Sequence, residues 1–304
     1  MKNNQVVAVV VTYNRVKLLR ECISSLLSQQ LNINHLIVIN NNSSDGTTKY
    51  LQQINDERLM VHNLPNNIGG AAGFELGLKY AFEETNDEYI WFMDDDTIPE
   101  KDAWSSLYKA AAFLKNNFGF LCSNVRWTNG LSTNVPSVVQ KWPDYIDQGL
   151  IRISKATFVS VVVTRRNLAK LGLPISQMVI WGDDTEFTTR FSSNLQSFFV
   201  TDSHVLHKTV NNLMDDSITS ISLDRINRYK YMYRNLIFIN RKYHGRRSEL
   251  HRAITNFRDL IKVIVHAKDH KMRRCWAVIA GTWNGLFFNP QIDYPNGSGG
   301  TDEI

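Results

Sequence analysis

Two clusters of carboxylates are the residues of this chain best suited to chemistry. The first, Asp94 to Asp96, comes directly after the apolar run Tyr89-Ile-Trp-Phe-Met93, and the second contains Asp183, Asp184 and Glu186. Because carboxylates at the end of a buried strand are costly to desolvate, we expect a positively charged partner to bind at the first cluster. Together the two clusters predict a metal site with a general base nearby.

The first cluster offers the donor atoms that a hard divalent cation prefers. Mg²⁺ and Mn²⁺ take oxygen ligands, and Asp94 and Asp96 supply carboxylates from alternate positions of one short loop. The alternative is a solvated loop, or the first turn of a helix that begins near Pro99 and Glu100. The acids of the second cluster have a similar alternative, since all three could interact with the dipole of a helix that they open.

The segments around the first cluster alternate between strand and helix patterns. Apolar runs predict strands at Val6–Val11, His35–Ile39, Leu59–His62 and Tyr89–Met93, with helices at Leu18–Leu27 and Gly69–Glu84. Such repeated units imply a parallel sheet that is covered on both faces, and ligands bind at the carboxyl ends of its strands. The polar motifs fall at that edge, at residues Thr12–Arg15, Asn40–Asp45, Asn67–Gly73 and Asp94–Asp96.

The pattern changes in the rest of the chain. Short β runs are predicted at 118–122 and 157–163, followed by a helix from Asp183 and a strand at Ser197–Val200, with His204 and His207 after it. Beyond residue 220 the chain is predicted to be mostly helical, with amphipathic helices at 227–239 and 251–265. The tail from Pro295 is predicted to be disordered.

Charge also divides the chain. Between Arg225 and Cys275, 15 Lys or Arg residues stand against 3 Asp or Glu, a local net charge of +12, whereas the whole chain carries +5. The remainder is therefore about −7 (5 − 12). A basic amphipathic region binds nucleic acid, an anionic membrane surface or a diphosphate-bearing acceptor, or pairs subunits. No nucleic-acid-binding motif accompanies it, so we expect no nucleic acid partner.

Cysteine usage and hydropathy bear on the compartment. Cys22, Cys122 and Cys275 lie far apart without a CxxC motif, which favours reduced thiols in a cytosolic environment. The run Val6–Val11 is too short for a signal peptide or a membrane span, and no stretch reaches the length of a transmembrane helix. We expect a cytoplasmic protein whose basic region would meet the inner face of the membrane.

Five motifs give the chain a resemblance to glycosyltransferase family two. They are Val9-Val-Val-Thr-Tyr-Asn-Arg15, Ile39-Asn-Asn-Asn-Ser-Ser-Asp-Gly-Thr47, Asn67-Ile-Gly-Gly-Ala-Ala-Gly-Phe74, Trp91-Phe-Met-Asp-Asp-Asp-Thr-Ile-Pro99 and Trp181-Gly-Asp-Asp-Thr-Glu186. Within the family, the chain resembles the bacterial galactofuranosyl- and rhamnosyltransferase branches. The resemblance covers about residues 5–210 and extends weakly to Tyr231–Asn235.

The resemblance implies an α/β protein with the GT-A fold, a Rossmann-like, mainly parallel sheet flanked by helices. The expected catalytic domain spans residues 1–220, with a nucleotide-binding half at about 1–97 and an acceptor half at about 98–220. Residues 221–304 would then form the basic helical C-terminal region. Enzymes of this kind transfer a sugar with inversion at the anomeric carbon.

The resemblance also implies the metal ligands. Asp96 is the expected direct ligand, Asp94 contacts the metal or the donor ribose, and His207 completes the site, with His204 as the alternative histidine. The expected cofactor is Mn²⁺ or Mg²⁺, which offsets the charge that develops on a nucleotide diphosphate as it leaves.

For the acceptor side, Asp184 matches the general base that takes the proton from the attacking hydroxyl. Asp183 and Glu186 raise its pKa by like-charge repulsion, or instead hold acceptor hydroxyls. Trp181 is interpreted as a platform for sugar stacking, or as a core residue.

Residues implied to bind the donor are Thr12, Tyr13, Arg15, Asn41, Asn67, Gly70, Asp94 and Asp95. Asn41 stands where the family usually has a second Asp that pairs with the base, and an amide can also hydrogen-bond a pyrimidine edge. Gly70 belongs to a small-residue turn with Gly69 and Gly73, which lets donor and backbone approach closely. Phe74 stands where many family members have Arg. The galactofuranosyl and rhamnosyl branches share this departure from Arg.

The predicted function is transfer of galactofuranose from UDP-galactofuranose to a growing, lipid-linked cell-surface polysaccharide. Phe74 and the two acidic motifs favour this donor, and dTDP-rhamnose is the alternative. A noncatalytic nucleotide-sugar-binding protein is a third hypothesis. The intact Asp184 and the complete acidic triplet argue against it.

Overall fold

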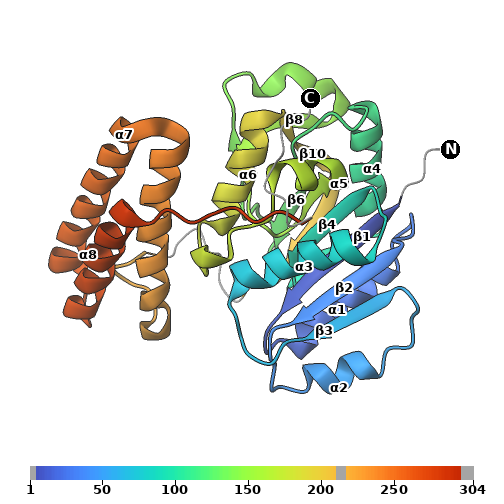
Figure 1. The fold of residues 1–304 in the computed structure, drawn as a ribbon, viewed down its shortest axis with the longest axis horizontal. Coiled ribbons are helices and arrows are strands. Elements are labelled where there is room, and N and C mark those ends of the chain that lie inside the picture. The colour runs from blue at the N-terminus through green and yellow to red at the C-terminus, as the bar shows by residue number, and fades with distance from the viewer. Residues whose placement is uncertain (1–4, 210–216, 296–304) are drawn as a thin grey trace.

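The fold is built on one ten-stranded sheet, seen in a computed structural model that describes residues 5–209 and 217–295 (Figure 1). Its order is β3-β2-β1-β4-β9-β6-β10-β8-β7, with β5 paired to β10. The first half is parallel and contains β1 (Val6–Thr12), α1 (Val16–Leu27), β2 (His35–Asn40), α2 (Thr47–Gln52), β3 (Leu59–Asn63), α3 (Gly70–Glu84) and β4 (Tyr89–Asp94). The predicted β-α units are confirmed.

The second half of the sheet is mixed. It contains β5 (Thr97–Pro99), α4 (Ala103–Phe113), β6 (Leu121–Trp127), β7 (Ser137–Val138), η1 (Trp142–Gln148), β8 (Leu150–Lys155), β9 (Val161–Thr164), α5 (Arg165–Leu171), η2 (Ser176–Met178), α6 (Asp183–Asn194) and β10 (Ser197–His207). Strand β9 runs antiparallel to β4 and β6, whereas β10 is parallel to β6 and antiparallel to β8 and β5. A strand of this half thus pairs directly with the parallel half.

Three predicted strands differ from the structure, and one alternative interpretation is excluded. Pro99 does not open a helix, because it pairs with Val205 in the sheet and α4 begins only at Ala103. The predicted strands at 118–122 and 157–163 are shifted, to β6 and β9. The strand predicted to end at Val200 continues through a register shift to His207, so that both late histidines belong to β10.

Both faces of the sheet are buried, as its apolar strands predict. Alternate residues of β1 separate into two clusters, in which Val10 packs with α1 and α4, whereas Val9 packs with α3 and α6. Helix α3 lies very close to β1, since a Cβ added to Gly77 would be 2.6 Å from Cγ1 of Val9. Gly73 makes the same kind of approach to Val11, so it serves helix packing rather than the donor turn.

The C-terminal region is helical, as predicted, and lies to one side of the sheet domain (Figure 1). It contains η4 (Leu223–Arg225), α7 (Ile226–His266) and α8 (Lys271–Phe287), and α7 is broken at Gly245 (φ 79°, ψ 176°). Helix α8 packs tightly on the first half of α7, because a Cβ on Gly281 would lie 2.5 Å from the Lys230 carbonyl oxygen.

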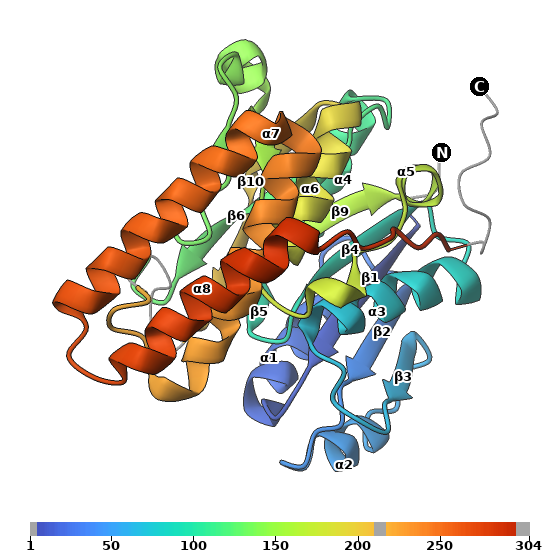
Figure 2. The ribbon, with the colours of Figure 1, turned by 60° about the vertical axis from the view of Figure 1, so that its left-hand side comes forward.

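After α8 the chain returns to the sheet domain (Figure 2). The amide of Leu173 donates to the carbonyl of Asp293 at 2.8 Å, and Gly172 leaves room for Ile292. The tail was predicted to be disordered from Pro295, but Pro295 itself is a buried turn residue, and the rest of the tail lies outside the described residues. Within the described part of the chain, none of the helices has the length and apolar character needed to cross a bilayer.

Candidate active site

The carboxyl ends of the parallel strands place the first acidic cluster at one edge of the sheet. Asp94 is the last residue of β4 and lies in register with Val11, while Thr12 is in register with Asn40 on the other side of β1. The next residues turn into β5, which is hydrogen-bonded to β10. The acidic triplet is therefore held between the two halves of the sheet.

Asp94, Asp96 and His207 form a trio whose ligand atoms all lie within 4.8 Å of one another. The His207 Nε2 atom is 3.1 Å from Asp96 Oδ1, and its Nδ1 atom is 2.8 Å from Asn134 Oδ1. Residues three apart in a strand point to opposite faces, so β10 cannot bring His204 to the same place. Of the two histidines that the sequence left open, the structure brings His207 to the cluster.

Positive groups inside the protein balance this cluster only in part. Although burial opposes ionisation, the hydrogen bond and charge of His207 and the charge of Arg15 keep the pKa of Asp96 below its usual value. Arg15 Nη1 lies 2.5 Å from Asp96 Oδ2. Burial, followed by the charges of Asp96 and Asp95, raises the pKa of Asp94 well above its usual value.

These features fit a divalent cation. The trio presents two carboxylates and one imidazole within coordinating reach of a common point, a donor set that suits Mn²⁺ and Mg²⁺. A second positive charge beside Asp94 would relieve the repulsion that raises its pKa. The site therefore has the properties of a DxD-type metal site completed by a histidine.

Asp95 has a different place from its two neighbours. It is buried and accepts hydrogen bonds from the Thr12 hydroxyl at 2.7 Å, the Tyr13 amide at 3.3 Å and Arg15 at 3.3 Å. Burial raises its pKa to about 6. Asp95 and Thr12, both expected to bind the donor, thus fix the loop after β1, whereas Tyr13 on that loop is 46% exposed.

Asn41 joins the end of β2 to the loop before α3. Its buried amide accepts from the Ile68 amide at 2.8 Å and donates to the Gly69 carbonyl at 3.1 Å. The exposed Asn67 accepts from the Gly69 amide, and Gly70 is the first residue of α3. The structure brings Asn41 and Asn67 to one loop, and their contact with a nucleotide stays a prediction.

The second acidic cluster follows a strained loop. Val179 (φ 67°) and Trp181 (φ 58°) both have left-handed backbone conformations, which are costly for such side chains. Asn235 of α7 holds this loop, since its Nδ2 atom donates to the carbonyls of Met178 at 3.0 Å and Trp181 at 2.7 Å. Strain of this kind persists only where surrounding contacts enforce it, and Asn235 provides them.

Asp183 and Asp184 open α6 directly after this loop. Burial and then the charge of Asp184 raise the pKa of Asp183 to about 7, and burial also raises the pKa of Asp184. Neither carboxylate forms an ion pair with any described residue, whereas Asp184 accepts from the Thr185 amide at 2.6 Å. The pair is therefore suited to accepting a proton near neutral pH.

Glu186 corrects one expectation. It is completely buried, and its carboxylate forms an ion pair with Arg190 at 2.9 Å, lies 3.6 Å from Lys242 and accepts a hydrogen bond from Tyr243. Because these partners surround it, Glu186 is not available to an acceptor hydroxyl. It ties α6 to α7 instead.

A cavity of about 480 Å³ extends from the metal trio to the loop before α6. Its lining includes Asp94, Asp96 and His207 from the metal trio, and Trp181 from the loop before Asp184. The Asp183 carboxylate is close enough to contribute to the raised pKa of Asp94. Trp181 also packs edge-on against Tyr229, with ring centroids 5.1 Å apart, so it borders the cavity and the core at once.

The cavity also has a cationic side that the sequence interpretation missed. Lys208 of the segment after β10, Arg225 and Arg228 line it together with Arg15. Burial and the neighbouring Arg225 lower the pKa of Arg228. The signal in the sequence was the basic run that starts at Arg225, for which a diphosphate-bearing partner was one of several interpretations, without any residue assigned to the site. Asn235 was visible only as the end of the weak resemblance at Tyr231–Asn235.

The fold defined by these elements is that of GT-A glycosyltransferases. Among solved structures, the chain is similar to GalNAc-T7 with UDP, GalNAc and Mn²⁺ (TM-score 0.62, 12% identity, 90% of this chain and 53% of that one). It is also similar to S. aureus TarS 1–349 in complex with UDP (TM-score 0.54, 16% identity, 86% of this chain and 72% of that one).

The chain belongs to glycosyl transferase family 2, whose family model matches residues 7–160. Among curated relatives, it is similar to galactofuranosyltransferase GlfT1 of Mycolicibacterium smegmatis (35% identity over 102 residues, 33% of this chain and 32% of that one). The GlfT1 of Mycobacterium tuberculosis is 33% identical over 93 residues, 30% of each chain. The matched segment thus spans about a third of these relatives.

Proposed function

We propose that this chain is an inverting, metal-dependent glycosyltransferase. It takes galactofuranose from UDP-galactofuranose and adds it to a growing cell-surface polysaccharide on a lipid-linked acceptor. The observation that carries this proposal is that one cavity joins the trio of Asp94, Asp96 and His207 to the loop that precedes Asp184. The likeness to GlfT1 supports galactofuranose as the sugar.

The donor diphosphate belongs at the metal trio and the cationic side of the cavity. Asp94, Asp96 and His207 would hold Mn²⁺ or Mg²⁺, which when bound offsets the negative charge that grows on the departing UDP. Arg228 and Lys208 line the same cavity and would carry part of that charge directly, since diphosphate oxygens accept hydrogen bonds from both types of side chain. Tyr13, exposed on the loop after β1, is available to the base or ribose.

Asp184 is the proposed base. As the acceptor oxygen bonds to the anomeric carbon, the bond from that carbon to the UDP oxygen breaks on the opposite face, and the hydroxyl proton moves to the Asp184 carboxylate. Its raised pKa increases its affinity for that proton. Trp181 provides an aromatic surface at the cavity wall for the sugar ring.

Calorimetric titration with UDP-galactofuranose, UDP-galactopyranose and dTDP-rhamnose, each with Mn²⁺ and with EDTA, tests the proposal. We expect binding of the furanose donor that depends on Mn²⁺. Preference for dTDP-rhamnose would keep the mechanism and move the chain to the neighbouring branch. Absence of binding to all three would overturn the donor assignment.

A further inference from the structure

The outer face of α8 exposes a continuous row of large apolar side chains. The row consists of Met272 (88% exposed), Trp276 (65%), Ile279 (48%), Trp283 (63%) and Phe287 (71%). Their spacing of three and four residues places them on one helix face, opposite the face that packs on α7. Soluble surfaces rarely leave aromatic rings of this size exposed in a row.

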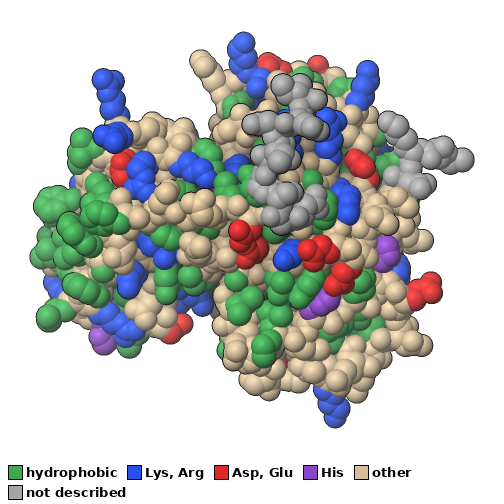
Figure 3. Space-filling view, viewed as in Figure 1, with side chains coloured by type: hydrophobic (Ala, Val, Ile, Leu, Met, Phe, Trp, Pro, Cys, Tyr) green, Lys and Arg blue, Asp and Glu red, His purple; other side chains and the backbone are tan. Residues whose placement is uncertain are grey.

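The second half of α7 repeats this row with the same spacing. Leu250, Ile254, Phe257 and Ile261 are all more than two fifths exposed. Figure 3 shows hydrophobic side chains gathered over these C-terminal helices, with Lys and Arg around them. Two neighbouring helices therefore present apolar rows on their solvent-facing sides.

Positive charge surrounds the rows. Each of the three acids between Arg225 and Cys275 has a basic partner in this region, since Glu249 pairs with Arg241, Asp259 with Lys262 and Asp269 with Arg274. Other basic side chains at the surface of this region are Arg246, Arg247, Arg258, Lys268, Lys271 and Arg273. Arg258 directly follows Phe257, so it lies beside the apolar row.

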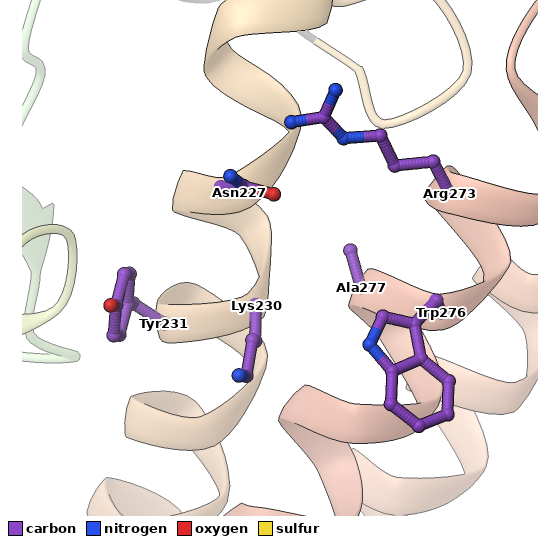
Figure 4. A pocket seen from close by; sticks show the side chains of 6 residues that line it. All are labelled: Asn227, Lys230, Tyr231, Arg273, Trp276 and Ala277. Atoms are coloured by element: carbon purple, nitrogen blue, oxygen red, sulfur yellow. The ribbon is translucent and has the colours of Figure 1, made fainter.

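A small cavity between α7 and α8 connects the apolar row of α8 with basic side chains. It measures about 200 Å³, and Trp276, Arg273 and Lys230 line it (Figure 4). Asn227, which also lines it, is next to Arg228, a residue of the active-site cavity. The first turns of α7 thus contribute residues to both cavities.

We propose that the outer faces of α8 and of the second half of α7 are a docking surface for an anionic lipid bilayer. The two apolar rows, with Trp276 and Trp283 among them, enter the interface between head groups and acyl chains. The surrounding Lys and Arg side chains lie among lipid phosphates. A second copy of the same face is disfavoured, because it would bring two segments 225–275 together, each with a net charge of +12. The inference goes beyond the proposed function and does not depend on it.

Sedimentation of the full chain with lipid vesicles tests this docking surface. We expect binding to vesicles of mixed phosphatidylglycerol and phosphatidylcholine, weakened by added salt, and much weaker binding to phosphatidylcholine alone. The double variant Trp276→Ser/Trp283→Ser is expected to partition about tenfold more weakly. Phe113→Ser is the matched control, because Phe113 is 53% exposed but lies on α4 of the sheet domain.

Three results would overturn the docking surface: no binding to anionic vesicles, equal binding to neutral ones, or equal binding of the double variant. Ultracentrifugation gives a further test. If the wild-type chain forms a dimer and does not bind vesicles, and the double variant is a monomer, this face is an interface between copies. Circular dichroism and the donor titration check that the variants remain folded. Failure of vesicle binding with intact donor binding leaves the proposed function standing.

Discussion

The two acidic clusters contain the same kind of side chain in opposite electrostatic settings. Asp96 of the first cluster faces Arg15, from the loop after β1, and His207, from β10. The first of these groups is positive and the second can be protonated. Asp183 and Asp184 of the second cluster have no ion-pair partner among the described residues and rest on the first turn of α6. Burial alone therefore does not define a carboxylate's function.

This difference indicates that each cluster binds a different positive partner. The first cluster supplies two carboxylates and an imidazole around one point, which suits a cation. The second has raised pKa values and no neighbouring cation in contact, which suits a proton. Glu186 shows a third outcome, since Arg190 and Lys242 neutralise it and leave it a structural residue.

The largest expected effect comes from removing the proposed base. Asp184→Asn should lower the transfer rate about a thousandfold while donor affinity changes less than about threefold, because the base acts on the acceptor. Transfer assays and calorimetry measure the two quantities. Asp102→Asn, which changes an exposed acid at the start of α4, controls for a general effect of acids at helix ends. An equal loss of donor affinity would mean that Asp184 belongs to the donor site.

Removing the histidine of the trio should affect the cation instead. His207→Ala is expected to weaken Mn²⁺-dependent donor binding about tenfold to a hundredfold, since it removes one of three ligands. His204→Ala is the matched control on the same strand and should bind the donor as the wild type does. Equal donor affinity in both variants, with Mn²⁺ present, would contradict the metal assignment.

Asn235 tests whether the strained loop matters for the second cluster. Asn235→Ala removes the donors to the Met178 and Trp181 carbonyls, so we expect about a tenfold lower kcat with donor affinity retained, because misplaced catalytic groups lose rate. Asn240→Ala on the same helix is the control, since Asn240 donates to the Leu236 carbonyl within α7. Normal kcat in Asn235→Ala would show that the loop keeps its shape without this residue.

The pH profile distinguishes a proton acceptor from a charged binding residue. Because burial raises the pKa of Asp184, the proposed base, kcat/KM should begin to fall on the acid side at a pH above the ordinary aspartate pKa of 3.8. The charge of Asp184 helps to raise the pKa of Asp183, and like-charge repulsion is mutual, so Asp183→Asn should move the acid limb to lower pH. A limb that does not move would show that the two carboxylates titrate independently.

The smallest expected effect concerns Glu75, an acid to which no catalytic role is assigned. Burial raises the pKa of Glu75 to about 7, and Asp293 beside it adds to the shift. Since the folded protein favours the protonated form, ionisation of Glu75 costs stability above pH 7 and almost none below its unfolded value near 4.5. Glu75→Gln should therefore raise Tm by roughly 2 °C at pH 8 and leave it unchanged at pH 4. An equal rise at both values would rule out ionisation as the cause.

The sequence was sufficient to predict the parallel half of the sheet and the meeting of the polar motifs at its edge. Apolar runs with short connections allow few other arrangements, as β1 to β4 illustrate. The continuation of β10 to His207 was less visible, because Thr201 and Asp202 interrupt the apolar pattern where the register shifts. Of the two histidines on β10, His207 reaches Asp96, because residues three apart in a strand point to opposite faces.

Contacts between distant segments were the main part that the sequence could not provide. No local pattern indicates that Asn235 holds a loop about 55 residues earlier, or that Arg190 and Tyr243 enclose Glu186. Motif matching assigned Glu186 to the acceptor because it considers residues near in sequence. Tyr243 of α7, which contacts Glu186, lies in the basic C-terminal region, which its composition had separated from the catalytic domain.

The return of the chain after α8 changes how the helical region should be regarded. Both of its ends are fastened to the sheet domain, the first through Asn235 and the second through the bond between Leu173 and Asp293. The helical region is therefore attached to the sheet domain at both ends, rather than at one end as a tail would be. A protease cut in the connection between α7 and α8, at Lys268 for example, would leave two fragments that stay bound to each other, because each keeps its own attachment and the buried contacts between the helices.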